Sequence, residues 1–257
     1  MLKTRLLSAL ALLPLPILAL YFGSPWFELF AALLLATMGW EWEKMVLGRF
    51  TVCGMAAAVV GVCGVYMLDL LPEAALVLPA VATVVLYAVV KKQGVAHPVL
   101  YALGVPYTAY PMMAIAYLSG EGGFPLTIWL FALVWAMDTG AYVFGKTIGG
   151  PKLCPKVSPK KTWAGLIGGM ATAALWGYAC AWYLQADDTL KIVVLTAVLA
   201  AVSQGGDLLE SAVKRYLGVK DSSDLIPGHG GVFDRLDALL AVAPVVALLV
   251  FFYGYRY

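Results

Sequence analysis

The sequence predicts an all-α membrane protein with about nine transmembrane helices. Apolar residues make up 62% of the 257 positions and charged residues only 12%, and the mean hydropathy is +0.87. A soluble domain usually carries about 25% charged residues, so a chain this apolar needs lipid to cover its surface. The other two observations are a series of apolar windows and the placement of the basic residues between them.

Nine windows are apolar and long enough to cross the hydrocarbon core, which takes about 20 residues of helix. We expect them at approximately 6–22, 26–43, 51–70, 73–90, 97–118, 124–145, 162–184, 190–212 and 236–254. The first window resembles a secretory signal, but further spans follow it at once, so we interpret it as an uncleaved helix. No linker divides the chain. We therefore predict one polytopic domain, with scaffold helices in residues 1–120 and catalytic helices and loops in residues 124–257.

The basic residues predict the orientation of these helices. If the N-terminus is cytoplasmic, fifteen of the 17 lysines and arginines lie on the inner side, and only Lys191 and Arg256 lie outside. Short cytoplasmic loops of membrane proteins carry such an excess of positive charge. Nine spans then place the C-terminus outside. We expect a multi-pass protein of the cell (inner) membrane whose chemically active surface faces the cytoplasm.

The first polar stretch on the predicted inner side extends from Asp138 to Trp163. The first five spans carry little internal charge apart from Glu28, so we expect the polar chemistry to begin at Asp138. Glycines in the stretch let the backbone approach an anion, lysines supply charge for phosphate, and the start of a helix offers free N–H groups. The candidates for substrate or phosphate binding are Asp138, Lys146, Ser158, Lys160, Lys161 and Thr162. These lysines are equally consistent with contacts to anionic lipid headgroups.

The second polar stretch, residues 203–237, contains a periodic pattern. If residues 200–215 are helical, then Ser203, Asp207, Ser211 and Lys214 share one face of the helix. Ionisable side chains inside a bilayer are costly and are a functional hypothesis by default. We therefore expect this face to contribute to a site at the inner edge of the membrane.

An irregular turn follows this helix at Pro227-Gly-His-Gly-Gly231, because four of its five residues break helices. The turn folds the chain back and can bring Asp234 beside Asp207. Two carboxylates among basic residues suit Mg²⁺, which binds one or two carboxylates together with substrate oxygens and water. His229 in the turn is as consistent with a hydrogen bond to the backbone as with proton transfer.

A simpler alternative treats these charges as ordinary ion pairs. It pairs Asp207 with Lys214 or Arg215, and Asp234 with Arg235. That alternative accounts for the charges but leaves the glycine-rich turn unexplained.

Residues 211–237 closely resemble the signature of the phosphatidate cytidylyltransferases, also called CDP-diacylglycerol synthases. The matching run reads S-A-V-K-R-x4-K-D-x3-L-I-P-G-H-G-G-V-F-D-R-L-D. The earlier segments D-T-G-A-Y-x2-G-K and S-P-K-K-T-W are similar to the same family, as is the multi-span layout. Thr-Trp is commonly followed by Glu-Gly in that pattern, whereas this chain has Ala164-Gly165, so we assign Ala164 no role.

The resemblance implies transfer of the cytidylyl group of CTP to phosphatidate, with Mg²⁺ as cofactor and CDP-diacylglycerol and pyrophosphate as products. It implies that Asp207 and Asp234 hold the metal. The other candidate catalytic residues are Lys214, Arg215, Lys220 and Arg235 to neutralise phosphates, Asp221 and Asp237 to complete the metal shell or orient the cations, and His229; Ser211 joins the phosphate-binding candidates. The expected partners are CTP, phosphatidate, the bilayer and a second copy of the chain in a homodimer, with no nucleic acid.

Three rival functions differ in chemistry. A CTP-dependent lipid kinase would transfer the γ-phosphate instead of the cytidylyl group. An ion-coupled transporter would place its carboxylates near the bilayer midplane and in both halves of the sequence, whereas all the candidates here lie in the second half. A prenyltransferase is disfavoured because Asp221-Ser-Ser-Asp224 lacks a doubled aspartate.

Overall fold

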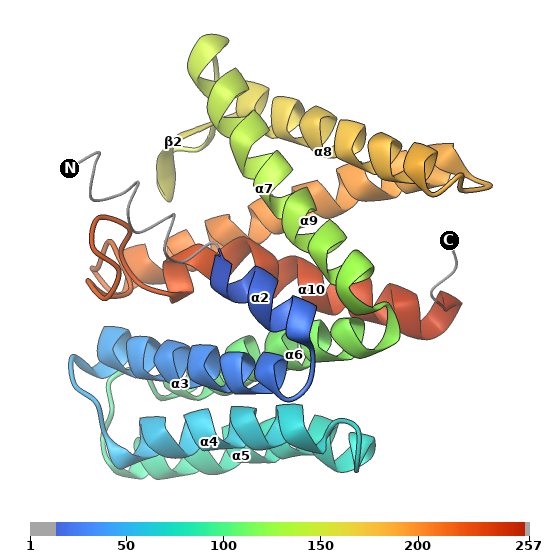
Figure 1. Cartoon of the computed structure of the whole chain (residues 1–257). Coiled ribbons are helices and arrows are strands. Elements are labelled where there is room, and N and C mark those ends of the chain that lie inside the picture. The colour runs from blue at the N-terminus through green and yellow to red at the C-terminus, as the bar shows by residue number, and fades with distance from the viewer. Residues whose placement is uncertain (1–13, 255–257) are drawn as a thin grey trace. The chain divides into compact units, whose positions relative to one another are not determined.

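The computed structural model describes residues 14–254. In that part of the chain, nine helices alternate with short connections and one β-hairpin (Figure 1). The elements are α2 (Pro14–Phe22), α3 (Trp26–Leu47), α4 (Val52–Met67), α5 (Pro72–Lys92), α6 (Pro98–Glu121), α7 (Gly123–Thr147), β1 (Lys152–Cys154), β2 (Ser158–Thr162), α8 (Trp163–Tyr183), α9 (Thr189–Tyr216) and α10 (Phe233–Tyr253). Each helix lies close to a predicted window. The predicted start of the first window, and the basic residues Lys3, Arg5 and Arg256, lie outside the described residues.

Six of these helices, α5 to α10, are long and apolar enough to cross a membrane. Large apolar side chains are exposed on them, including Val84 (68% exposed), Leu175 (69%) and Phe252 (72%). Large apolar side chains exposed in such number on apolar helices require lipid to cover them. The chain is therefore a multi-pass membrane protein. The count of nine spans stays a prediction, because α4 has only 16 residues and only nine residues of α2 are described.

The chain forms two compact units, which are described separately. Unit 1 contains α2 to α6, the connection between α9 and α10, and the first turn of α10. Within it, α3 packs against α2, α4 and α6, and α6 also packs against α4 and α5. Fully buried Leu35 and Met38 of α3 and Met112 of α6 contribute to its core. The core of unit 1 is thus built around α3 and α6.

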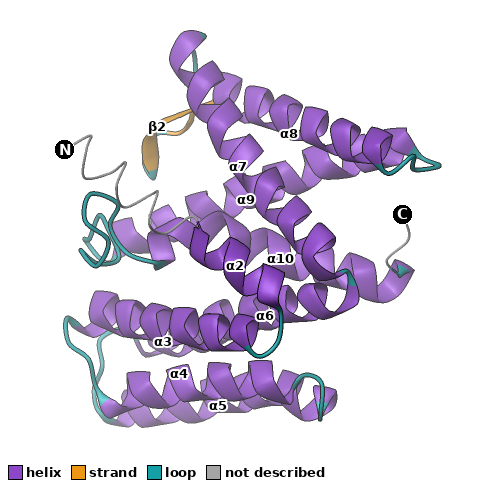
Figure 2. Cartoon of the chain, in the orientation of Figure 1, coloured by secondary structure: helices purple, strands orange, loops and turns teal. Residues whose placement is uncertain are grey.

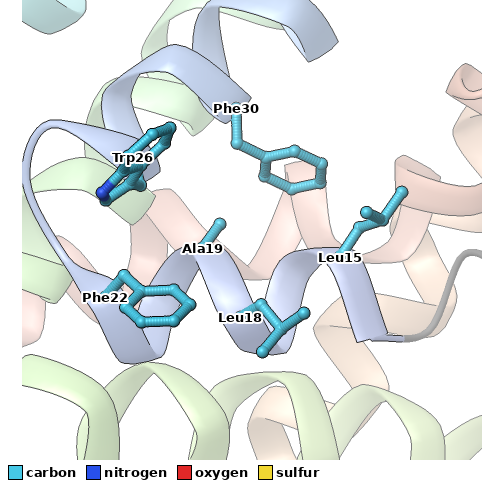
Figure 3. A pocket seen from close by; sticks show the side chains of 6 residues that line it. All are labelled: Leu15, Leu18, Ala19, Phe22, Trp26 and Phe30. Atoms are coloured by element: carbon cyan, nitrogen blue, oxygen red, sulfur yellow. The ribbon is translucent and has the colours of Figure 1, made fainter.

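An apolar groove of about 370 Å³ lies between α2 and α3 in unit 1. Figure 3 shows the six side chains that line it, which are Leu15, Leu18, Ala19, Phe22, Trp26 and Phe30. None of them is charged. A groove with this lining offers no stabilisation to a triphosphate, so the polar chemistry lies elsewhere.

Unit 2 contains α7, the hairpin, α8, α9 up to Arg215, and α10 from Asp237. Glycines let α7 and α8 approach closely. A Cβ added at Gly140 of α7 would clash with Thr172 and with the carbonyl oxygen of Gly168, both on α8. On the other side of the unit, a Cβ at Gly206 of α9 would clash with Ala241 of α10. These contacts fix the helices that carry the polar residues of this unit.

We expect Gly140→Ala to lower the stability of the protein by about 1–3 kcal/mol, because the added methyl group overpacks the contact between α7 and α8. The matched control is Gly205→Ala on α9, where no atom lies within 4 Å of the added Cβ. The control should stabilise the helix by roughly 0.5–1 kcal/mol. Thermal unfolding midpoints in detergent measure both effects. Equal midpoints for the two variants would contradict the close packing.

The hairpin corrects one sequence-based expectation. Residues 158–162 were expected to form the entry to the next helix, but they form strand β2 (Figure 2), which pairs antiparallel with β1. The helix then begins directly after the strand. Thr162 caps it, because the Thr162 hydroxyl accepts a hydrogen bond from the amide of Gly165 at 3.0 Å. The free N–H groups predicted at this point are therefore partly satisfied within the chain.

Candidate active site

The predicted polar face of residues 200–215 lies on α9, and the structure confirms that this stretch is helical. Ser203 is fully buried, and its hydroxyl donates to the carbonyl of Ala200 at 2.8 Å. The hydroxyl of Ser211 donates to Asp207 Oδ1 at 3.4 Å, which confirms that residues four apart meet on this face. Lys214, one turn further, is buried and forms an ion pair with Glu210 at 2.6 Å.

Asp207 forms an ion pair with Lys161 of β2. The two side chains are 27% and 19% exposed, respectively, so the pair is partly shielded from solvent. Arg215, at the end of α9, reaches the same hairpin, where its Nε lies 3.5 Å from the carbonyl oxygen of Val157. The hairpin thus brings the predicted phosphate-binding lysine to the predicted metal ligand. The simple alternative of an Asp207 pair with Lys214 or Arg215 did not include this partner.

Asp237 of α10 belongs to the same unit. Its carboxyl group experiences the charges of Asp207, of Asp138 on α7 and of Lys214. The amide of Ala238 donates to Asp237 Oδ1 at 2.8 Å. We use the name α9 cluster for Asp138, Lys161, Asp207, Lys214 and Asp237. The cluster contains three carboxylates and two ammonium groups, contributed by α7, β2, α9 and α10.

Four other candidates lie on exposed surface. Lys146 is at the end of α7, where its ammonium group lies 5.5 Å from the centre of the Tyr142 ring. Lys160 of β2, Lys220 and Arg235 are exposed. Ser158 is at the start of β2 and is half-buried. Exposed cations of this kind are available to phosphate groups in solution, and their roles stay predictions.

The predicted glycine-rich turn lies in unit 1, in the connection between α9 and α10 (Figure 2). We call residues 220–232, within this connection, the signature loop. The amide of Ile226 donates to the carbonyl of Gly230 at 2.8 Å, and the amide of His229 donates to that of Ile226 at 2.9 Å, which closes a tight turn. Gly228 and Gly230 have φ angles of +80° and +84°, which favour glycine. The Nδ1 atom of His229 is buried and has no hydrogen-bond partner among the described residues.

Asp234 lies two residues after the end of the signature loop, in the first turn of α10, and is 9% exposed. Its Oδ2 accepts hydrogen bonds from the amide of Gly231 at 2.8 Å and from the amide and hydroxyl of Ser222, both at 3.0 Å. The carboxylate therefore joins the two ends of the loop. Asp221, beside Ser222, is exposed.

The structure corrects the expectation that the first five spans lack internal charge. Glu41 and Glu43 of α3 are 0% and 1% exposed. Glu41 binds the signature loop, with the hydroxyl of Ser223 donating to it at 2.6 Å and the amide of Phe233 at 2.7 Å. The sequence interpretation missed Glu41, although its signal was present. Two carboxylates stood inside an apolar window, where ionisable groups are costly.

Glu43 makes a different set of contacts. It accepts hydrogen bonds from the amide of Thr51 at 2.7 Å, the amide of Gly54 at 3.1 Å and the hydroxyl of Tyr101 at 2.6 Å. These partners lie at the start of α4 and on α6. Glu43 therefore holds the scaffold of unit 1 together, whereas Glu41 holds the loop.

The donor atoms of the candidate metal ligands suit Mg²⁺. In the described part of the chain, no three His, Cys, Asp or Glu side chains come together as a metal-binding group. Mg²⁺ does not require such a group, because it is usually bound by one or two carboxylates together with phosphates and water. Asp207 and Asp234 each present a carboxylate, the first in unit 2 and the second in unit 1.

Comparison with known proteins gives a consistent result. Residues 3–253 match the profile of the cytidylyltransferase family. The chain is 36% identical over 252 residues to a phosphatidate cytidylyltransferase of Brucella suis, covering 96% of this chain and 92% of the relative. It is 35% identical over 286 residues to a protein of the same name from Haemophilus influenzae, covering 98% and 99% of the two chains. A third, from Rickettsia bellii, is 37% identical over 160 residues, covering 58% and 68%.

The family match extends over both units and includes α9, the signature loop and α10. The matched region therefore includes every candidate site residue described above. The chain belongs to the cytidylyltransferase family.

Proposed function

We propose that this protein transfers the cytidylyl group of CTP to phosphatidate, forming CDP-diacylglycerol and pyrophosphate for phospholipid synthesis. The observation that carries the proposal is the match of almost the whole chain, 96%, to a relative named phosphatidate cytidylyltransferase. The α9 cluster and the signature loop support it, because both combine carboxylates with basic residues. One substrate is a membrane lipid and the other is a soluble nucleotide, which suits polar residues on membrane helices.

The reaction is a single displacement at phosphorus. A phosphate oxygen of phosphatidate attacks the α-phosphorus of CTP, the bond from that phosphorus to the bridging oxygen breaks, and pyrophosphate leaves. Phosphoryl transfers of this type depend mainly on positioning and on neutralising charge. A phosphate monoester is largely ionised near pH 7, so a strong general base is not required. His229 is therefore not needed as the base.

The basic residues are assigned to the phosphates. Lys214, Arg215, Lys220 and Arg235 are proposed to neutralise them, with Lys160 and Lys161 as further candidates. Lys161 already forms an ion pair with Asp207, so phosphate binding there would exchange one anionic partner for another. Arginine and lysine differ in this role, since the guanidinium group can bind two phosphate oxygens at once.

Mg²⁺ is the proposed cofactor, with Asp207 and Asp234 as the ligands that the sequence predicts. When bound, the ion would neutralise the charge of the triphosphate. Asp221 and Asp237 would assist by orienting the basic residues. Asp234 is held in place by hydrogen bonds from Ser222 and Gly231.

Labelled CTP tests this function in one assay. The protein, purified in detergent, is incubated with phosphatidate, Mg²⁺ and CTP labelled at either the α- or the γ-phosphate. We expect α-label to enter the lipid and γ-label to leave as pyrophosphate. Transfer of γ-label to the lipid would instead identify a lipid kinase, and the absence of any transfer would leave the transporter as the better explanation.

The orientation is part of the same proposal. The N-terminus and the basic loops are proposed to face the cytoplasm and the C-terminus the outside of the inner membrane, with a homodimer as the assembly. We expect a reporter that is active only in the cytoplasm to be inactive when fused after Tyr257. A second fusion after Gly150, in the basic stretch, should be active. Activity of the first fusion would overturn the count of nine spans.

A further inference from the structure

We propose that Glu41 is a positioning residue that holds the signature loop and Asp234 in place for cytidylyl transfer. The inference rests on the proposed function and concerns a side chain from the first half of the sequence, outside the family signature. Glu41 is fully buried in α3, and the loop follows it by about 180 residues in the chain.

The carboxylate of Glu41 contacts both ends of the loop. At the first end, the hydroxyl of Ser223 donates to Oε1 at 2.6 Å and that of Ser222 to Oε2 at 3.2 Å. At the second end, the amide of Val232 donates to Oε1 at 2.9 Å and that of Phe233 to Oε2 at 2.7 Å. Each oxygen thus joins the start of the loop to its end. Hydrogen bonds to a buried charged group are about twice as strong as neutral ones.

The loop backbone is shaped around this carboxylate. A Cβ added at Gly231 would clash with Glu41 Oε1 and with the hydroxyl of Ser222. Glycine at this position therefore allows the close approach. Ser223 also accepts a hydrogen bond from the amide of Leu225 at 3.1 Å, which extends the contact from Glu41 into the glycine-rich turn.

The same anchor determines the position of Asp234. Phe233, the residue before it, is fully buried, and its ring packs against those of Trp42 and Tyr107 with centroids 5.5 and 5.6 Å apart. The Phe233 amide donates to Glu41, which is adjacent to Trp42 on α3. The start of α10 is therefore fixed to α3 by a hydrogen bond and by aromatic packing. Asp234 then binds Ser222, which also binds Glu41.

The test compares Glu41→Gln with Glu43→Gln. Both replace a buried carboxylate of α3 with its isosteric amide, but Glu43 contacts Thr51, Gly54 and Tyr101 instead of the loop. Hydrogen exchange is measured by mass spectrometry in detergent. We expect amides of residues 221–233 to exchange at least ~10-fold faster in Glu41→Gln. The substitution removes the charge of the acceptor and replaces one of its two oxygens with an NH₂ group, which cannot accept a hydrogen bond from a loop amide. In Glu43→Gln the change should be confined to the start of α4.

Steady-state kinetics provides the second readout. We expect Glu41→Gln to raise the KM for CTP and to lower kcat, giving a kcat/KM at least ~10-fold lower, because the loop carries charges assigned to phosphates. A role that is only structural would lower kcat through a smaller active fraction and leave KM unchanged. Glu43→Gln is expected to show that second pattern. Ser223→Ala keeps the Glu41 carboxylate and removes the hydroxyl that donates to Glu41 and accepts from the Leu225 amide, so it should shift KM and loop exchange in the same direction by less.

Wild-type exchange of residues 221–233 together with an unchanged KM in Glu41→Gln would overturn the inference. If Glu41→Gln fails to fold, the test uses Ser223→Ala, and wild-type exchange together with an unchanged KM in that variant would overturn the inference. If the wild-type protein transfers no cytidylyl group, the proposed function fails, and the exchange comparison alone decides whether Glu41 anchors the loop.

Discussion

Asp207→Asn is expected to reduce CTP-dependent formation of CDP-diacylglycerol by at least ~100-fold while the protein still inserts into the membrane. The side chain keeps its size but loses its charge, so it binds a cation weakly and no longer balances Lys161. The rate of pyrophosphate release in detergent measures the effect. Asp187→Asn, in an exposed turn before α9, is the matched control and should turn over like the wild type.

A loss of activity in Asp207→Asn has two possible origins, because Asp207 is also the ion-pair partner of Lys161. The double variant Asp207→Lys with Lys161→Asp, which exchanges the two side chains, separates these two origins. If the ion pair only supports the structure, the exchange should restore activity, since the pair re-forms with reversed charges. We expect no recovery, because a carboxylate is required at 207 itself. Near-normal turnover of Asp207→Asn would show that Asp207 is not a metal ligand.

The helices could be predicted from the sequence because their signal is local. A window of apolar residues predicts a membrane helix wherever it occurs, so the window 73–90 is found as α5 with bounds Pro72–Lys92. The hairpin was missed for a physical reason. Strand β2 contains Ser, Pro and two lysines, which are poor strand formers. Its pairing depends on β1, and on the position of α8 directly after it.

The candidate site could be predicted only as far as its residues lie near one another in the chain. The spacing of Asp207 and Ser211 predicted their contact, and the five residues of the turn predicted its irregular shape. No spacing predicts that Lys161 meets Asp207, because this pair depends on how the hairpin packs. Glu41 was hidden by averaging, since the window 26–43 stays apolar overall although it contains three carboxylates. A buried charge is informative in itself.

Asp234→Asn is also expected to abolish turnover, by at least ~100-fold, and here the structure sharpens the test. The Asp234 carboxylate accepts hydrogen bonds from Ser222 and Gly231, so its loss could act through the shape of the loop instead of through charge. Ser222→Ala removes one of these donors, together with its hydrogen bond to Glu41, and keeps the Asp234 carboxylate. We expect this control to lower the rate by roughly 10-fold, which corresponds to the loss of about 1.5 kcal/mol from one hydrogen bond to a charged group.

Hydrogen exchange of residues 221–232 distinguishes the two origins. If Asp234 only closes the loop, exchange and activity should change together, and Asp234→Asn should resemble Ser222→Ala in both. If the carboxylate also binds a cation, Asp234→Asn should lose far more activity than Ser222→Ala, even where the two variants show similar hydrogen exchange in the loop. Near-normal CTP-dependent turnover of Asp234→Asn would refute the metal assignment. Glu41 would still anchor the loop in that case, because its hydrogen bonds to Ser223, Val232 and Phe233 do not involve Asp234.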